Sequence, residues 1–263
     1  MKILAVVLLL GIMLSSCGNK ADSERLNDSA FTTTAESSAV DSDSMDVDES
    51  SQVGNESDIQ SDSSEDDMKW RLFEDTYKET DSGRAAENYA HNKGIKIEGF
   101  VKYGQENPPV CDLILGKIAG VGCEVIAAYN YLTYEGFEPD MAKLAYDFEK
   151  NALIAADGSL GSNPRKISGL FKAMGVGYKR FYKVDEAQAA VEEGKPVIVS
   201  YHIGLNIFSG IHTAFAVKEE GRLYVYNCYN SAADKTEMES IYQLMNKNSL
   251  FIVGYTEDDG QMR

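Results

Sequence analysis

Cys123 stands at a position where a cysteine side chain can act as a nucleophile. It follows Gly122 and begins an apolar run that reaches Leu132, and the spacing of the apolar residues predicts a helix. A thiol in the first turn of a helix faces backbone N–H groups without helical partners and the positive end of the helix dipole. Both favour the thiolate, which is the reactive form. Cys123 is therefore the candidate nucleophile of an acyl-transfer reaction.

A histidine and an amide follow Cys123 in chain order. His212 precedes an apolar strand predicted over 213–217, and Asn227 directly follows a strand predicted over 223–226. In thiol catalysis a histidine takes the proton of the cysteine, and a third polar residue orients the imidazole. The order cysteine, histidine, asparagine fits these roles, so we expect the three side chains to meet in one site.

Each of these residues has a competing interpretation. A lone cysteine on an apolar helix is often a core residue, and a histidine can be a hydrogen-bonded residue at a sheet edge. His202 ends the strand before His212 and competes with it for the role of base, or could bind substrate. Asn230 competes with Asn227, which could instead be a turn residue. The glycine turn before Cys123 and the strand after His212 favour the catalytic interpretation.

Two patterns of hydrophobicity predict the elements that must position these residues. Helical spacing comes first and predicts helices over 70–91 (one or two), 123–132, 140–155, 165–174 and 184–193. β-Branched and aromatic runs come later and predict strands over 196–201, 213–217, 223–226 and 250–255, with a looser one over 95–103. Helices first and strands later are typical of the α+β class.

The motifs together resemble a known family. They are Gly122-Cys123-Glu124 before a helix, the strand 194–199, Gly210-Ile211-His212-Thr213, and Tyr224-Val225-Tyr226-Asn227. Their order is similar to that of the papain-like cysteine peptidases, and within them to the bacterial branch related to peptidases that remove double-glycine leaders from bacteriocins. The resemblance covers about 121–255.

This resemblance implies a fold and a set of roles. Cys123 would be the nucleophile, His212 the general base and acid, and Asn227 the residue that orients the imidazole. The implied α+β fold is papain-like: an N-terminal nucleophile helix and a helical subdomain pack on an antiparallel β-sheet, with the cleft between them.

The sequence departs from the family at the oxyanion site. Relatives commonly carry a glutamine six residues before the nucleophile, where this chain has Lys117, and the nearest upstream glutamine is Gln105. Loss of one oxyanion donor typically lowers the rate by about 10²–10³. We expect the backbone N–H of Cys123 to serve as one donor and a second to come from 105–117 or 200–209. Glu124 also stands where relatives often have glycine.

The N-terminus has the features of a signal peptide. Lys2 is positive, and 3–13 is apolar but too short for an ordinary transmembrane helix. Leu14-Ser15-Ser16-Cys17 is typical of a bacterial lipoprotein cleavage box, in which the cysteine becomes the first mature residue and carries lipid. We expect a signal peptide over 1–16 and a lipid anchor at Cys17; an ordinary secretory signal is the alternative.

An acidic segment follows. Between 21 and 67 there are 15 acidic residues against the single basic residue Arg25, in a serine-rich stretch with few long apolar side chains. Such a composition cannot bury enough surface to offset its ordering entropy, so 17–68 is expected to be a disordered tether. This tether carries most of the formal net charge of −17, which argues against nucleic acid as a partner.

The remaining 69–263 is long enough for one domain with a core of its own. It contains three cysteines, Cys111, Cys123 and Cys228; if Cys123 is the nucleophile, Cys111 and Cys228 could form a disulfide or remain thiols. No paired Cys or His spacing indicates a metal, and no motif indicates a cofactor.

These features favour a cysteine hydrolase of peptide or amide bonds. We expect it to be lipid-anchored on the bacterial cell membrane, to face the extracytoplasmic side, and to act on a peptide or protein. The alternative is a catalytically inactive papain-like surface lipoprotein that binds a peptide or another partner, which the lysine at position 117 would favour. Cleavage or transpeptidation of cell-wall peptides is a third hypothesis.

Overall fold

The computed structural model describes residues 69–101, 112–113, 116–152, 162–204, 210–228, 235–258 and 260. The predicted signal peptide, Cys17, the tether, Gln105 and Cys111 lie outside these residues.

Short helices dominate the first half of the described residues. They are α1 (Phe73–Thr76), α2 (Arg84–Asn92), α3 (Ile118–Val121), α4 (Cys123–Tyr134), α5 (Met141–Asn151), α6 (Ile167–Met174) and α7 (Val184–Glu192), with 3-10 turns η1 (Pro164–Lys166) and η2 (Ile241–Leu244). None of these helices is long and apolar enough to cross a membrane.

Most strands lie in the second half and form one antiparallel sheet. They are β3 (Lys179–Phe181), β4 (Val197–His202), β5 (Ile211–Glu219), β6 (Arg222–Tyr226), β7 (Thr236–Met238) and β8 (Leu250–Thr256), in the spatial order β3-β8-β4-β5-β6-β7. A separate two-stranded ladder joins β1 (Asp112–Leu113) to β2 (Gly116–Lys117). In the β4–β5 pair, Tyr201 lies opposite His212, so the end of β4 and the start of β5 lie side by side.

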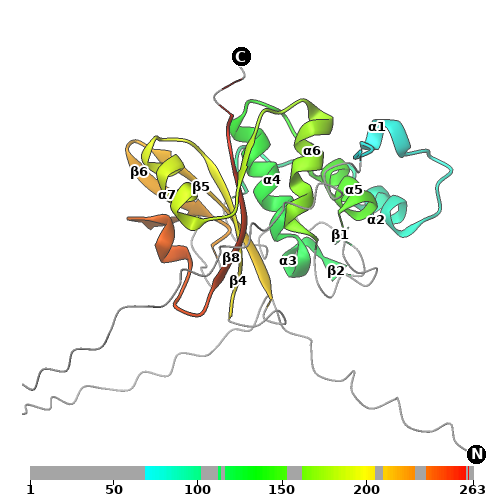
Figure 1. Cartoon of the computed structure of the whole chain (residues 1–263). Helices are drawn as coiled ribbons and strands as arrows, with labels where there is room; N and C mark the ends of the chain where they lie inside the picture. Colours follow the sequence, from blue (N-terminus) through cyan, green and yellow to red (C-terminus); the bar gives the residue numbers. More distant parts are fainter. Residues whose placement is uncertain are drawn as a thin grey trace, which may run out of the picture. The chain divides into compact units, whose positions relative to one another are not determined.

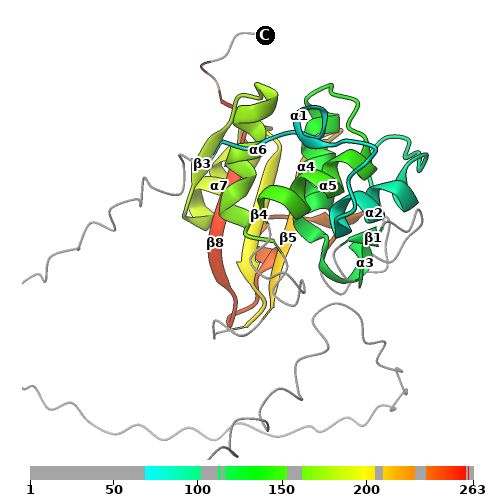
Figure 2. The same cartoon turned by 90° about the vertical axis from the view of Figure 1, so that its right-hand side faces the viewer.

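Helices cover both faces of this sheet. Ile198, Phe215 and Val253 belong to one core cluster with α4, α5 and α6, and these helices lie together on one side of the sheet in Figures 1 and 2. The alternate residues Val199 and Ala214 pack with α7 and η2 in a second cluster. Successive strand residues face opposite sides, which produces this division. The predicted α+β class, with helices packed on an antiparallel sheet, is confirmed.

α4 is the central helix of the first cluster. Residues 123–132 are all buried, so the helix has no solvent-facing polar side over this stretch. It begins directly after α3, and Gly122 makes the close approach of the two helices feasible. A Cβ at this position would lie 2.1 Å from Cγ1 and 2.7 Å from the carbonyl oxygen of Ile118. The glycine therefore places Cys123 at the first residue of a buried helix.

One predicted strand is wrong. Within 95–103, the described residues 95–101 form no strand. Asn130 on α4 explains the difference: its side chain accepts a hydrogen bond from Val101 N at 2.7 Å and donates one to Val101 O at 3.1 Å. Because this buried amide satisfies both backbone groups, the segment is held against α4 instead of a strand. The three-residue strands β3 and β7 were too short for the sequence pattern to indicate.

Candidate active site

The Cys123 thiol is buried at the start of α4. The residue is 4% exposed, and its Sγ lies 3.1 Å from Oε2 of Glu124, to which it donates a hydrogen bond. The same Sγ lies 4.0 Å from the carbonyl oxygen of Ile211, the residue before His212. The start of α4 and the start of β5, which the sequence separates by 88 residues, therefore lie side by side.

His212 is buried and held by the main chain of Asn227. Its Nε2 lies 2.6 Å from the Asn227 carbonyl oxygen. Because a carbonyl oxygen can only accept, Nε2 carries the hydrogen, and this tautomer leaves the lone pair on Nδ1. Burial lowers the pKa of His212 from 6.5 to about 4, and the bond to Asn227 opposes part of that change. The imidazole is therefore neutral at neutral pH.

Asn227 holds the imidazole with its backbone, whereas the sequence suggested its side-chain amide. The residue has a φ of 56°, in the left-handed region that asparagine tolerates better than most residues. Its Nδ2 donates to the carbonyl oxygen of Thr213 at 3.3 Å, and the residue is buried. The left-handed turn at the end of β6 thus directs the carbonyl to His212 while the amide anchors the turn to β5.

Contacts from both faces of the sheet surround the thiol and the imidazole. The His212 ring packs edge-on against Tyr201, with centroids 5.9 Å apart, and Tyr201 belongs to the cluster on the α7 face. Cys123 contacts Glu124 and the main chain of Ile211 from the α4 side. The structure therefore brings the two residues to the same end of the sheet, and the thiol's hydrogen-bond acceptor at 3.1 Å is Glu124.

Glu124 is a site residue that the sequence analysis did not identify. It is 1% exposed, and burial raises the pKa of its carboxyl from 4.5 to about 7, against the opposing effect of the Cys123 hydrogen bond. The available indication in the sequence was an acidic residue inside an otherwise apolar helix, directly after the nucleophile. An N-terminal acid is ordinary in a helix, so the pattern alone did not distinguish it.

The competing residues are only partly placed. His202 ends β4, half-buried, with Ile211 opposite it in the strand register, so it lies near the same end of the sheet. Asn230 lies outside the described residues, and so do the side chain of Lys117 and most of the segments expected to supply a second oxyanion donor. That donor remains a prediction.

The cysteine pair is also untested. Cys228 follows Asn227 and is half-buried, and burial raises the pKa of its thiol. Cys111 lies outside the described residues. The disulfide between Cys111 and Cys228 therefore stays a prediction.

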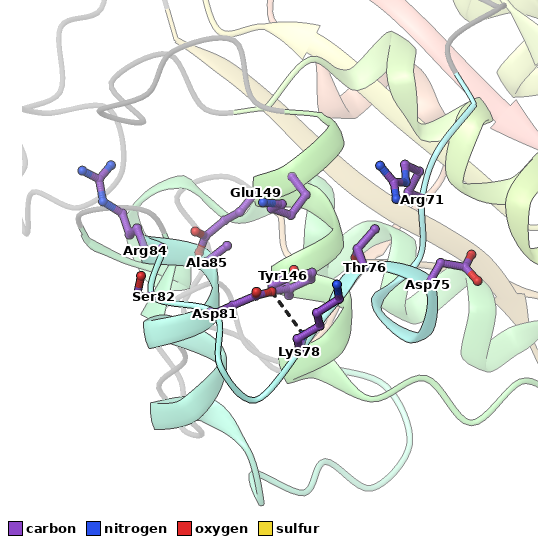
Figure 3. A pocket seen from close by; sticks show the side chains of 13 residues that line it. Arg71, Asp75, Thr76, Lys78, Asp81, Ser82, Arg84, Ala85, Tyr146 and Glu149 are labelled. Carbon is purple, nitrogen blue, oxygen red and sulfur yellow. Dashed lines mark hydrogen bonds between the residues drawn. The ribbon is translucent and has the colours of Figure 1, made fainter.

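A hollow of about 840 Å³ lies elsewhere, beside α1, α2 and α5. Its lining combines basic residues such as Arg71 and Lys78 with acidic ones such as Asp75 and Asp81, as Figure 3 shows. The Lys78 backbone N–H donates to Asp81 at 3.1 Å across its rim. Neither Cys123 nor His212 lines it. Over the described parts of the chain, no group of three or more His, Cys, Asp or Glu side chains could hold a metal ion.

Comparison with known proteins gives similarity to solved structures. No family model matches the chain, and no curated protein is similar to it in sequence. Among solved structures, a crystal structure of a protein from Bacillus anthracis, described as a candidate C39-like peptidase, is similar over 60% of this chain and 95% of its own. The two are 17% identical, with a TM-score of 0.38.

Proposed function

We propose that this protein is a papain-like cysteine hydrolase of peptide or amide bonds, with Cys123 as its nucleophile. The observation that carries the proposal is the position of the Cys123 thiol. It lies at the first residue of a buried helix, 3.1 Å from a carboxylate oxygen and 4.0 Å from the main chain next to His212. A core cysteine needs neither a helix start nor an acidic neighbour.

The reaction would proceed through an acyl-enzyme. The thiolate attacks the carbonyl carbon, an S–C bond forms, and the oxyanion is stabilised by donors that include the Cys123 backbone N–H. The C–N bond then breaks as the leaving amine takes a proton, and water hydrolyses the thioester. In the triad that the sequence predicts, His212 moves these protons and Asn227 orients its ring. The bond from His212 Nε2 to Asn227 supports the orienting role.

The proposed setting is the outer side of a bacterial membrane. Cleavage after Ser16 would leave Cys17 as the lipid-bearing first residue, and the acidic segment to residue 68 would connect the domain to the anchor. The substrate would be a peptide or protein that reaches this surface.

The experiment compares the wild-type chain with Cys123→Ala and Cys228→Ala. We measure the hydrolysis of a mixture of fluorogenic peptides and the labelling of the protein by an electrophilic probe that acylates reactive cysteines. We expect Cys123→Ala to lower hydrolysis by at least about 10³-fold and to abolish labelling, because the nucleophile is lost. Cys228→Ala should keep both, because that thiol takes no part. Equal hydrolysis by the wild type and Cys123→Ala would contradict the proposal.

A second function has an observation in its favour. The His212 ring is packed on Tyr201, and Lys117 occupies the usual glutamine position. These features suit a catalytically inactive domain that binds peptides. Saturable peptide binding by the wild type without turnover, unchanged in Cys123→Ala, would support this function over hydrolysis.

A further inference from the structure

We propose that Glu124 is the group that takes the proton of the Cys123 thiol, so that the reactive unit is a Cys123–Glu124 pair. The inference assigns to Glu124, in place of His212, the proton transfers of the proposed hydrolase, and it rests on that function for the catalytic consequence. The proton transfer itself can be tested without any substrate.

The contact geometry places acceptor and donor together. Sγ of Cys123 and Oε2 of Glu124 are 3.1 Å apart, within hydrogen-bond distance for sulfur. Both residues are at least 96% buried in the first turn of α4, so water cannot replace either partner easily. Rigid packing on all sides of the helix holds the carboxylate against the thiol.

The charge of the pair also favours this role. In the described parts of the chain, no basic side chain forms an ion pair with Glu124. Its carboxyl is faced by the Cys123 thiol, by its own backbone N–H and, without a hydrogen bond, by the Ser162 hydroxyl. The pair therefore shares one proton and one negative charge. Moving the proton from sulfur to oxygen leaves the net charge unchanged, so the transfer needs no separation of charges in the buried site.

The basicities of the two candidate acceptors differ strongly. Burial raises the pKa of Glu124 to about 7 and lowers the pKa of His212 to about 4. The Glu124 carboxylate is therefore the stronger base of the two and accepts the thiol proton more readily than the His212 imidazole. Efficient proton transfer favours the better-matched acceptor.

The chemical step is balanced within the pair. The Sγ–H bond breaks, the proton goes to Oε2 of Glu124, and the sulfur electron pair forms the S–C bond to the substrate carbonyl. The protonated carboxyl then gives its proton to the leaving amine as the C–N bond breaks. Water adds to the thioester and returns a proton to Glu124, and departure of the sulfur restores the starting thiol and carboxylate.

The pair predicts a two-step pH profile for alkylation. Once the pair has lost its first proton, near pH 7, a constant fraction is present as thiolate with protonated Glu124. The second proton leaves only at much higher pH, because two negative charges would lie side by side. The logarithm of the Cys123 alkylation rate should therefore be nearly flat from about pH 7.5 to 9, whereas a lone thiol gives unit slope up to about pH 8.5.

The test measures iodoacetamide alkylation of Cys123 by mass spectrometry from pH 6 to 10. The variants are Glu124→Gln, which keeps size and hydrogen bonding, and His212→Gln as the matched control. We expect the flat region in the wild type and in His212→Gln, and a continuous rise with unit slope in Glu124→Gln. If Glu124→Gln does not fold, Glu124→Asp should keep a flat region, at a different rate, because the carboxylate remains.

The outcomes separate the two proposals. A flat region that survives Glu124→Gln, or that is lost in His212→Gln alone, overturns the assignment of Glu124. If the alkylation profiles are as expected but the protein hydrolyses no peptide, the Cys123–Glu124 pair is supported and the hydrolase function is contradicted. A Cys123 that resists alkylation at every pH contradicts both.

Discussion

Replacement of Asp147 by asparagine should stabilise the domain, and more at pH 7.5 than at pH 5. Asp147 lies on α5 and is 5% exposed. Its carboxylate accepts the backbone N–H of Phe73, whereas its Oδ1 is buried without a hydrogen-bond partner among the described residues. Burial, followed by the negative charge of Glu74, raises the pKa of this carboxyl from 3.8 to about 8.

The sign follows from proton binding. The folded state binds this proton more tightly than the unfolded state, so stability is highest below about pH 4 and is lost as the pH rises towards 8. At about 1.36 kcal/mol per pH unit, the loss is about 1.5 kcal/mol at pH 5 and about 5 kcal/mol at pH 7.5. Asp147→Asn removes the charge and keeps an oxygen for Phe73 N–H. Its gain in unfolding free energy should be about 3 kcal/mol larger at pH 7.5.

Urea unfolding at the two pH values measures this difference. Trp70 is the only tryptophan of the chain and is buried, so its fluorescence reports the transition. The control is Asp140→Asn, the same chemical change at the exposed N-cap of α5, where asparagine is an equally favoured cap. It should change the unfolding free energy by much less than Asp147→Asn does at pH 7.5, because asparagine caps a helix as well as aspartate. An equal effect of Asp147→Asn at both pH values would refute the reasoning.

Two further predictions concern backbone conformation and packing. Asn227→Ala should be less stable than Asn227→Gly by about 1 kcal/mol in urea unfolding. Both variants lose the hydrogen bond to Thr213, but only alanine is strained at the positive φ of 56°. Equal stabilities of the two variants would contradict this prediction. Gly169→Ala should lower stability by about 1–3 kcal/mol and shift Trp70 emission to longer wavelength, because a Cβ there would lie 2.2 Å from Cδ1 of Trp70. Gly116→Ala, with open space around its Cβ, is the control, and an unchanged Trp70 spectrum in Gly169→Ala would count against the packing argument.

The local pattern of hydrophobic residues in the sequence was enough to predict most of the main helices and strands. The apolar run after Gly122 became the buried helix α4, and the runs at 196–201 and 250–255 became β4 and β8. These predictions succeeded because long apolar segments can be buried in few ways, and their periodicity decides between helix and strand. The segment 95–103 failed because the partner of Val101 is a side chain, Asn130, 29 residues away. A contact over this distance in the sequence cannot be predicted from the local spacing of hydrophobic residues.

The sequence by itself determined the order of the chemistry: a cysteine at a helix start, a histidine at a strand start and an asparagine after the next strand. These are short-range features, since a glycine turn and an apolar period act over a few residues. The tertiary structure alone decided which atoms meet. It set the Glu124 carboxylate against the thiol and the Asn227 carbonyl against His212, and it buried both titratable groups. Desolvation depends on everything that packs around a group, so the raised pKa of Glu124 and the lowered pKa of His212 arise only when distant segments come together.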